Sequence, residues 1–237
     1  MNPYEKLINR KRKWTPVQTT AGTCKEGAEE AIFRALALRH MELPVGDFIT
    51  DALSSDVPNN ARDILLSNVK DEENHDLALG YIANAYGVDQ TAEAEALRLK
   101  AAWEAHPDHT ITKALVAERA IFFVLLPFFR FNGDAGMRTV SADISRDEQI
   151  HVATNSLVHT ELGYNISPSL DKLRKATINW VMQPLGDHAD KYLNKKFWLD
   201  SSDRLMYEGK APQLAETKAA RMPAFFEHSN VNLPQYA

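Results

Sequence analysis

The four-residue phrase Glu-x-x-His occurs twice in this chain, as Glu72-x-x-His75 and as Glu148-x-x-His151. Both copies lie in stretches with a helix-like pattern of apolar residues. Residues three apart share one face of a helix, so each copy directs a carboxylate and an imidazole toward the same point. Two such pairs, with one carboxylate from each of two further helices, form the ligand set of dimetal sites in four-helix bundles. The repeat therefore predicts a helical bundle that holds two metal ions.

Apolar periodicity and turn-forming residues predict an all-α chain, because no apolar run of useful length alternates as a strand does. Four main helices are expected at residues 25–43, 58–86, 112–132 and 134–161, followed by Pro44, Gly87, Gly133 and Gly163. Further helices are expected at residues 90–105, 167–195 and 214–226.

The depth of a residue along its helix, counted from the nearest turn, selects the first additional carboxylate. To within one position, Glu29 lies as far before Pro44 as Glu72 lies after Pro58. At 1.5 Å per residue, the two carboxylates of an antiparallel helix pair lie about 21–22 Å from the same end. The neighbouring Glu30 is the alternative, but Glu29 borders the apolar stripe of its helix and Glu30 points away from it. We therefore predict Glu29 as the ligand from this helix.

The same count selects Glu118 as the second additional carboxylate. Glu118 lies as far before Gly133 as Glu148 lies after it. Glu118 is also the only acidic residue in the apolar run 114–131, where a carboxylate is costly unless it is paired, hydrogen-bonded or bound to a metal. Pro127 removes a backbone hydrogen bond from this helix, which predicts either a widened turn beside the site or a tolerated local strain.

Length and composition restrict the class of protein. The chain has 237 residues, of which 44% are hydrophobic and 25% charged, as in ordinary soluble domains. The formal net charge of −5 argues against a general nucleic-acid-binding protein. The single cysteine, Cys24, excludes an internal disulfide and fits the reducing cytoplasm, and no membrane span or signal peptide is recognisable. We expect one domain over 1–237, with an arm at 1–24, a metal-binding bundle at 25–163 and C-terminal helices with a tail at 164–237.

The predicted ligands offer oxygen and nitrogen donors and no thiolate, a set that suits iron or manganese. They are Glu29, Glu72, His75, Glu118, Glu148 and His151. The apolar residues Phe122, Leu126 and Ile144 are expected nearby, where they would exclude water from the centre or simply pack the core. A centre of this kind reduces O₂ or peroxide and retains the oxidising equivalents.

Two segments of the chain resemble the small, radical-generating subunit of class I ribonucleotide reductase. They are Glu118-Arg-Ala-Ile-Phe-Phe123 and Ile144-Ser-Arg-Asp-Glu-Gln-Ile-His151, of which the Ser-Arg-Asp-Glu-x-x-His block is the most specific. The segments at 4–8, 14–16 and 221–226 also resemble the N- and C-terminal regions of that family. The resemblance implies a ferritin-like four-helix bundle with additional helices, a dimetal cofactor (Fe/Fe or Mn/Fe), a homodimer and a separate large catalytic subunit.

The resemblance also implies roles for single residues. It assigns the six predicted ligands to the metals and makes Asp147 the carboxylate that hydrogen-bonds a ligand histidine, His75. Trp14 matches the tryptophan that relays an electron toward the metals together with that aspartate, although a hydrophobic anchor for the arm is an equal alternative. Tyr236 is placed to serve as the tail tyrosine of the same relay.

The chain departs from the family pattern at the position of the radical-bearing tyrosine, four residues after the first ligand histidine. That position holds Leu79, which is not oxidisable, and Tyr81 is turned away from it by about 200° on the helix. The resemblance therefore favours the variant that stores its oxidising equivalent on a Mn/Fe cluster. The tail, 232–237, lacks the acidic, Phe-ended character that family members use to dock the large subunit.

Three functions are compatible with these features. The first is a ribonucleotide reductase small subunit, an oxidoreductase of deoxyribonucleotide synthesis for DNA replication, whose nucleotides bind the partner because this chain has no Gly-rich phosphate loop. The alternative is a stand-alone dimetal oxygenase or oxidase that acts on an aliphatic or aldehyde substrate. An oxygenase requires a tunnel to the metals, whereas a radical subunit seals that space with side chains such as Phe122 and Leu79. An iron-storage protein is the third and is disfavoured by the length of the C-terminal region.

Overall fold

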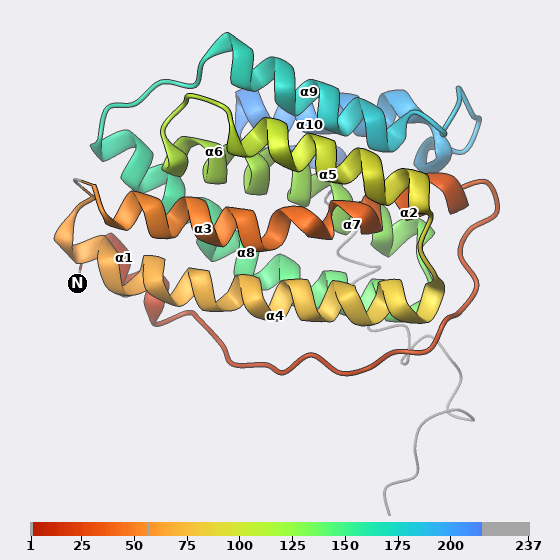
Figure 1. The fold of residues 1–237 in the computed structure, drawn as a ribbon, viewed down its shortest axis with the longest axis horizontal. Coiled ribbons are helices and arrows are strands. Elements are labelled where there is room, and N and C mark those ends of the chain that lie inside the picture. The colour runs from red at the N-terminus through yellow and green to blue at the C-terminus, as the bar shows by residue number, and fades with distance from the viewer. Residues whose placement is uncertain (1, 56, 215–237) are drawn as a thin grey trace, which may run out of the picture.

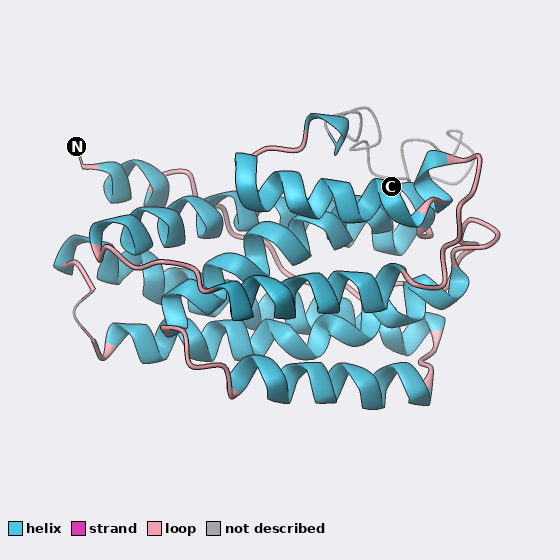
Figure 2. Ribbon diagram, turned by 90° about the horizontal axis from the view of Figure 1, so that it is seen from above, coloured by secondary structure: helices cyan, strands magenta, loops and turns pink. Residues whose placement is uncertain are grey.

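The computed structural model describes residues 2–55 and 57–214, and this part of the chain contains helices and no β-strand (Figure 1, Figure 2). The helices are α1 (Pro3–Ile8), α2 (Glu29–Ala37), α3 (Glu42–Leu53), α4 (Arg62–Tyr86), α5 (Gln90–Glu104), α6 (Thr110–Ala117), α7 (Phe123–Asn132), α8 (Ala135–Glu161), α9 (Pro168–Met182) and α10 (Lys195–Glu208). Short 3₁₀ turns occupy Leu38–Met41, Asn59–Ala61 and Lys191–Leu193, and a π-helical turn, Glu118–Phe122, joins α6 to α7. Within the described ranges, no helix combines the length and the apolar character that crossing a bilayer requires.

Four helical segments form the centre of the bundle, namely α3, α4, the α6–α7 segment and α8 (Figure 1). α3 packs against α4 and α6, and α8 packs against α4, α6 and α7. α5 lies beside α2, while α9 and α10 contact the α6–α7 segment from the outside. Buried apolar side chains from these helices form a continuous core, which includes Trp103, Phe128 and Trp198. The inner faces of the four central segments therefore meet in one interior layer.

Capping residues define the two helices that carry the repeated motif. α4 ends before Gly87, whose φ of 101° lies in the region that favours glycine. α8 begins after Asp134, whose carboxylate accepts a hydrogen bond from the backbone N–H of Met137 at 2.8 Å. α8 ends just before Gly163, which has a φ of 67°. Both helices thus end next to the glycines, Gly87 and Gly163, that were used to predict where they end.

The first predicted helix, 25–43, differs from the structure. The chain runs from α2 through the 3₁₀ turn Leu38–Met41 directly into α3, and Pro44 lies in the first turn of α3. A proline is tolerated in a first turn because the N–H groups there have no partner within the helix. The turn that leads to α4 follows only after Leu53. The antiparallel partner of α4 is therefore α3, and not a helix that ends at Pro44.

The predicted helix 112–132 is present but contains the π-helical turn, which ends shortly before Pro127. Of the two outcomes expected for this helix, the structure shows a widened turn. Such a turn changes the pairing of backbone carbonyls, and one of them is satisfied from outside the helix. The hydroxyl of Ser202 on α10 donates to the carbonyl oxygen of Ala120 at 2.7 Å in a buried contact. α10 therefore stabilises the turn that carries Glu118.

The C-terminal helices also differ from the prediction of one helix over 167–195. α9 ends at Met182, and α10 begins only at Lys195, the last residue of the predicted helix, and runs to Glu208. Pro184 explains the break, because a proline cannot donate to the helix and disfavours helical geometry in the preceding residue. Most of the predicted helix 214–226, the 221–226 and 232–237 segments and Tyr236 lie outside the described residues.

The N-terminal arm begins with α1, whose first turn is capped by a reciprocal capping box. The Asn2 side chain accepts from the N–H of Glu5 at 2.8 Å, and the Glu5 carboxylate accepts from the N–H of Asn2 at 3.0 Å. α1 packs against α4 and α8, and the irregular segment after it runs along the bundle beside α4 (Figure 1). The arm thus places its residues next to the two helices that carry the repeated motif.

Candidate metal centre

Each central segment of the bundle contributes acidic or imidazole side chains to one buried cluster. The cluster comprises Glu42 of α3, Glu72 and His75 of α4, Glu118 of the π-helical turn, and Glu148 and His151 of α8. All six residues are at most 2% exposed. Ionisable groups are rarely buried at this density unless they pair with one another or hold metal ions.

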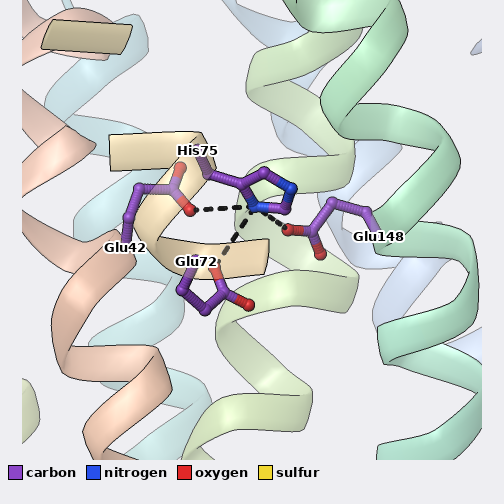
Figure 3. A group of neighbouring side chains, drawn as sticks. All are labelled: Glu42, Glu72, His75 and Glu148. Carbon is purple, nitrogen blue, oxygen red and sulfur yellow. Dashed lines mark hydrogen bonds and ion pairs between the residues drawn. The ribbon is translucent and has the colours of Figure 1, made fainter. Parts of the chain in front are cut away.

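One half of the cluster surrounds His75 (Figure 3). Nδ1 of its ring lies 3.3 Å from Oε2 of Glu72, 3.4 Å from Oε1 of Glu148 and 3.7 Å from Oε2 of Glu42. The three carboxylates come from three different helices and point toward the same ring nitrogen (Figure 3). This half therefore presents three oxygen donors and one nitrogen donor around a common point.

The other half of the cluster surrounds His151. Nδ1 of its ring lies 2.9 Å from Oε1 of Glu72, 3.6 Å from Oε1 of Glu118 and 3.9 Å from Oε1 of Glu148. Glu72 and Glu148 thus approach both histidines, whose ring centroids are 5.6 Å apart. Glu42 approaches only His75, and Glu118 only His151. The two histidines thus share two carboxylates, and each also has one carboxylate that the other does not approach.

Glu29 is not part of this cluster, so the predicted set must be corrected at that residue. Glu29 is exposed at the start of α2, where its carboxylate accepts a hydrogen bond from the N–H of Gly27 at 2.8 Å. Glu30 is exposed as well and pairs with Arg34. Glu42 takes the place assigned to Glu29. The count failed because it started from Pro44, which does not end a helix.

Glu42 and Glu72 lie at matching depths when residues are counted from the turn between α3 and α4. To within one position, Glu42 lies as far before the end of α3 at Leu53 as Glu72 lies after the start of α4 at Arg62. In an antiparallel pair, these two carboxylates are therefore at the same level. The other predicted residues, Glu72, His75, Glu118, Glu148 and His151, do come together.

Two aspartates lie just outside the six-residue cluster, where they contact the histidine nitrogens that point away from it. Asp147 Oδ2 lies 3.4 Å from Nε2 of His75, and Asp71 Oδ2 lies 2.9 Å from Nε2 of His151. Each aspartate belongs to the helix opposite its histidine, so α4 and α8 exchange these contacts. Such contacts orient an imidazole and direct its other nitrogen toward a metal. Sequence reasoning missed Asp71, although it directly precedes Glu72 as Asp147 precedes Glu148.

Trp14 of the arm reaches the same outer layer. Its Nε1–H donates to Oδ2 of Asp147 at 2.5 Å, and its ring stacks on His75 with the centroids 6.3 Å apart. Trp14 is half-buried, whereas Asp147 and His75 are buried. The three side chains therefore form a line from the surface of the protein to the cluster.

The amide of Asn155 holds one of the carboxylates. Its Nδ2 donates to Oε2 of Glu118 at 2.6 Å, and both residues are fully buried. The second oxygen of Glu118 remains directed toward His151. Asn155 lies one helical turn after His151 on α8, a spacing that was available in the sequence but had no assigned partner.

The sequence matches no protein-family model, and no curated protein is similar to it at a significant level. A solved structure described as "putative class I ribonucleotide reductase from Bacillus halodurans" superposes with a TM-score of 0.58 at 14% identity, over 94% of this chain and 96% of that chain. The protein has a ferritin-like, ribonucleotide-reductase-type fold. The predicted all-α, ferritin-like architecture is therefore confirmed, and at this level of identity the likeness concerns the fold.

The cluster contains buried oxygen and nitrogen atoms without a hydrogen-bond partner, and these atoms are suited to bind metal ions. Several buried atoms have no hydrogen-bond partner, namely Glu42 Oε2, Glu72 Oε1, Glu118 Oε1, both carboxylate oxygens of Glu148, and Nδ1 of His151. The 2.9 Å contact between Glu72 and His151 lacks the geometry of a hydrogen bond. Unsatisfied polar atoms are costly in a buried site. Two cations would satisfy all of them with oxygen and imidazole donors, which suit iron or manganese.

Crowding of the ionisable groups shifts their pKa values. Burial raises the pKa of Glu42 and of Glu118 to about 8, because it disfavours the charged carboxylates. Burial also acts to raise the pKa of Glu72, but the close contacts and positive charges of His151 and His75 outweigh it and lower that pKa to about 2. Burial lowers the pKa of each histidine, and the surrounding carboxylates reverse this and raise both values well above the usual range.

These shifts predict how the stability of the metal-free protein depends on pH. Glu42 and Glu118 have folded pKa values above their unfolded ones, so their contribution is full below about pH 4.5 and is lost as pH rises to about 8. The raised histidine pKa values act with the same sign above pH 6.5. We expect the free energy of unfolding to fall from pH 5 to pH 8, by up to about 1.4 kcal/mol per pH unit for each group that keeps its proton.

Denaturant unfolding of chelator-treated protein at several pH values measures this slope. Replacing Glu118 with Gln removes one contributing group and should flatten the slope. A Glu30→Gln variant, which changes an exposed carboxylate, should retain it. A free energy of unfolding that rises between pH 5 and pH 8 would contradict the assignment.

Proposed function

We propose that this protein is the small subunit of a class I ribonucleotide reductase and that it holds two metal ions, Fe/Fe or Mn/Fe. The observation that carries this proposal is the hydrogen-bonded line Trp14–Asp147–His75. A storage protein or an oxygenase does not need a tryptophan that is hydrogen-bonded, through an aspartate, to a metal-binding histidine. When bound, the metal pair supplies the oxidising equivalent.

The residues of the line have separate tasks in this function. Asp147 orients His75 and offers a carboxylate oxygen to the indole N–H of Trp14 at 2.5 Å, so the proton of an oxidised tryptophan has an acceptor at hand. Trp14 is half-buried on the arm and so connects the cluster to the side of the molecule that a partner can reach. The oxidising equivalent would pass along this line to a cysteine of the large catalytic subunit, which also binds the nucleotide.

Burial of the side chains that are expected to close the space near the metals favours this function over a stand-alone oxygenase. Leu79 and Phe122 are 5% and 3% exposed. A pocket of about 290 Å³ lies beside the π-helical turn, but Arg119, Gln149 and Val152, the sequence neighbours of ligands, line it instead of the ligands themselves. Leu79 also stands where a radical tyrosine is expected. We therefore propose that the oxidising equivalent resides on the metals and not on a tyrosine.

The test is to load the purified chain with Fe²⁺, Mn²⁺ or both, to add O₂, and to record EPR spectra before and after adding a class I large subunit. A coupled metal signal without a tyrosyl signal, together with reduction of ribonucleotides that needs both subunits, is expected. Turnover of a long-chain aldehyde by the chain alone would overturn the proposal in favour of the dimetal oxygenase.

We also propose that the subunit acts in the cytoplasm as a homodimer, formed through the outer face of α4. Leu66 and Leu77 on this face are 52% and 44% exposed. Lys70 and Glu73 between them are exposed, and neither forms an ion pair with any residue in the described ranges. A two-fold axis through the middle of this stretch would place Leu66 opposite Leu77 and Lys70 opposite Glu73 of a second copy, so apolar residues would meet apolar ones and opposite charges would pair.

Charge exchange on this face tests the homodimer. Lys70→Glu and Glu73→Lys should each convert a dimer to a monomer in sedimentation velocity, because each creates like-charge contacts. An equimolar mixture of the two single variants should form a heterodimer, and the double variant should dimerise with itself. If the single variants remain dimeric, the interface lies elsewhere.

A further inference from the structure

The arm contacts the outer layer of the cluster at two places, and only one of them belongs to the proposed relay. Trp14 contacts Asp147, as described above. Slightly earlier in the arm, the ammonium group of Lys11 forms an ion pair with Asp71, the aspartate behind His151. The arm thus reaches the aspartates of both histidines.

Lys11 is buried to an unusual degree for its place in the sequence. Its side chain is 9% exposed, although its neighbours Arg10 and Lys13 are exposed. Besides Asp71, it donates to Oδ1 of Asn68 at 2.8 Å, and Asn68 is fully buried. A buried ammonium group is costly unless it is paired and hydrogen-bonded, so the contacts with α4 direct Lys11 inward.

Asp71 needs a cation for the same reason. Its side chain is 14% exposed, and its Oδ2 atom serves both Lys11 and Nε2 of His151. Removing one partner of a buried pair leaves the other charge uncompensated. A carboxylate in that state is stabilised by turning toward water or by taking up a proton. Without Lys11, Asp71 would lose the constraint that keeps its oxygen against His151.

We propose that Lys11 is a positioning residue for the metal position at His151, acting through Asp71. The inference rests on the proposed metal centre but not on the reductase activity. Because Trp14 serves the His75 position from the same arm, docking of the arm completes the outer layer of both positions. The two positions nevertheless have different supports. Lys11 pairs with Asp71 behind His151. Behind His75, Asp147 accepts from the indole N–H of Trp14 and lies 3.8 Å from Nε of Arg12.

Single-position variants separate the two metal positions in the test. Glu42→Ala should keep only the position at His151, and Glu118→Ala only the position at His75. In the Glu42→Ala protein, Lys11→Met should weaken Mn²⁺ binding about 10–100-fold, the usual effect of losing a residue that orients a ligand. In the Glu118→Ala protein, the same change should leave Mn²⁺ affinity unaltered. Calorimetric titration with Mn²⁺ measures both.

Two further variants distinguish positioning from a general effect on the arm. Lys11→Arg retains a cation and should restore most of the affinity, whereas Lys13→Met removes an exposed lysine close by in the arm and should change nothing. Asp71→Asn should reproduce the effect of Lys11→Met and carries the test if Lys11→Met fails to fold by circular dichroism. Equal losses at both positions, or no loss at His151, would overturn the proposal.

The outcome is separable from that of the proposed function. If the wild-type chain binds two Mn²⁺ ions and responds to Lys11→Met as expected, but never supports ribonucleotide reduction with a large subunit, the reductase assignment fails and the role of Lys11 stands. If the wild-type chain binds no metal ion, both fail. If reduction occurs but Lys11→Met leaves the His151 position unaffected, only the role of Lys11 fails.

Discussion

Replacing Glu72 with alanine is expected to remove both metal ions from the protein. Its two carboxylate oxygens face His75 at 3.3 Å and His151 at 2.9 Å, so one substitution takes a donor from each position. Outer contacts alone change metal affinity about 10–100-fold, and the loss of a direct donor should exceed that range. Bound metal per chain, measured by elemental analysis after loading and desalting, should fall from two to zero.

A paired comparison tests the corrected ligand. Glu42→Ala should lower the metal content from two to one, because only the His75 position loses a donor, whereas Glu29→Ala should leave two ions bound. Both changes remove a glutamate from the same stretch of the chain, and Glu29 is exposed while Glu42 is 2% exposed. The opposite result would show that the chain binds metal in an arrangement other than this one.

Trp14→Phe is expected to abolish nucleotide reduction in the presence of the large subunit while leaving both metal ions bound. Phenylalanine retains the ring that stacks on His75 but has no N–H for Asp147, and it is much harder to oxidise than tryptophan. Rates of deoxyribonucleotide formation and metal content, measured on the same sample, separate the relay from the alternative in which Trp14 only anchors the arm.

Trp180→Phe is the matched control for this experiment. Trp180 is also half-buried, but it lies on α9, where the guanidinium of Arg34 stacks over its ring. Its replacement should change neither metal content nor activity. If Trp14→Phe retains full activity, the proposed route through Asp147 is wrong. If it loses the metal ions as well, the indole serves the structure of the site and the relay has no support from this variant.

Much of the site could be predicted because helices convert sequence spacing into direction. The i, i+3 spacing placed Glu72 beside His75 and Glu148 beside His151 without knowledge of any long-range contact. Glu118 followed from one correct turn, since Gly133 does separate α7 from α8. The same count gave a wrong residue, Glu29, where the assumed turn was a proline in the first turn of a continuing helical path.

The sequence by itself determined the helical class, the helices α4 and α8 and the five cluster residues that lie on correctly bounded helices, because these depend on local periodicity and on glycine and cap signals. The tertiary structure alone decided the rest. Whether the chain turns at Pro44 depends on packing, since a first-turn proline is compatible with both outcomes. The contacts of Asp71 with His151 and of Lys11 with Asp71 join segments that no local pattern relates. These contacts form because a buried charge is costly unless it is paired. Which charges are buried is decided only when the bundle has folded.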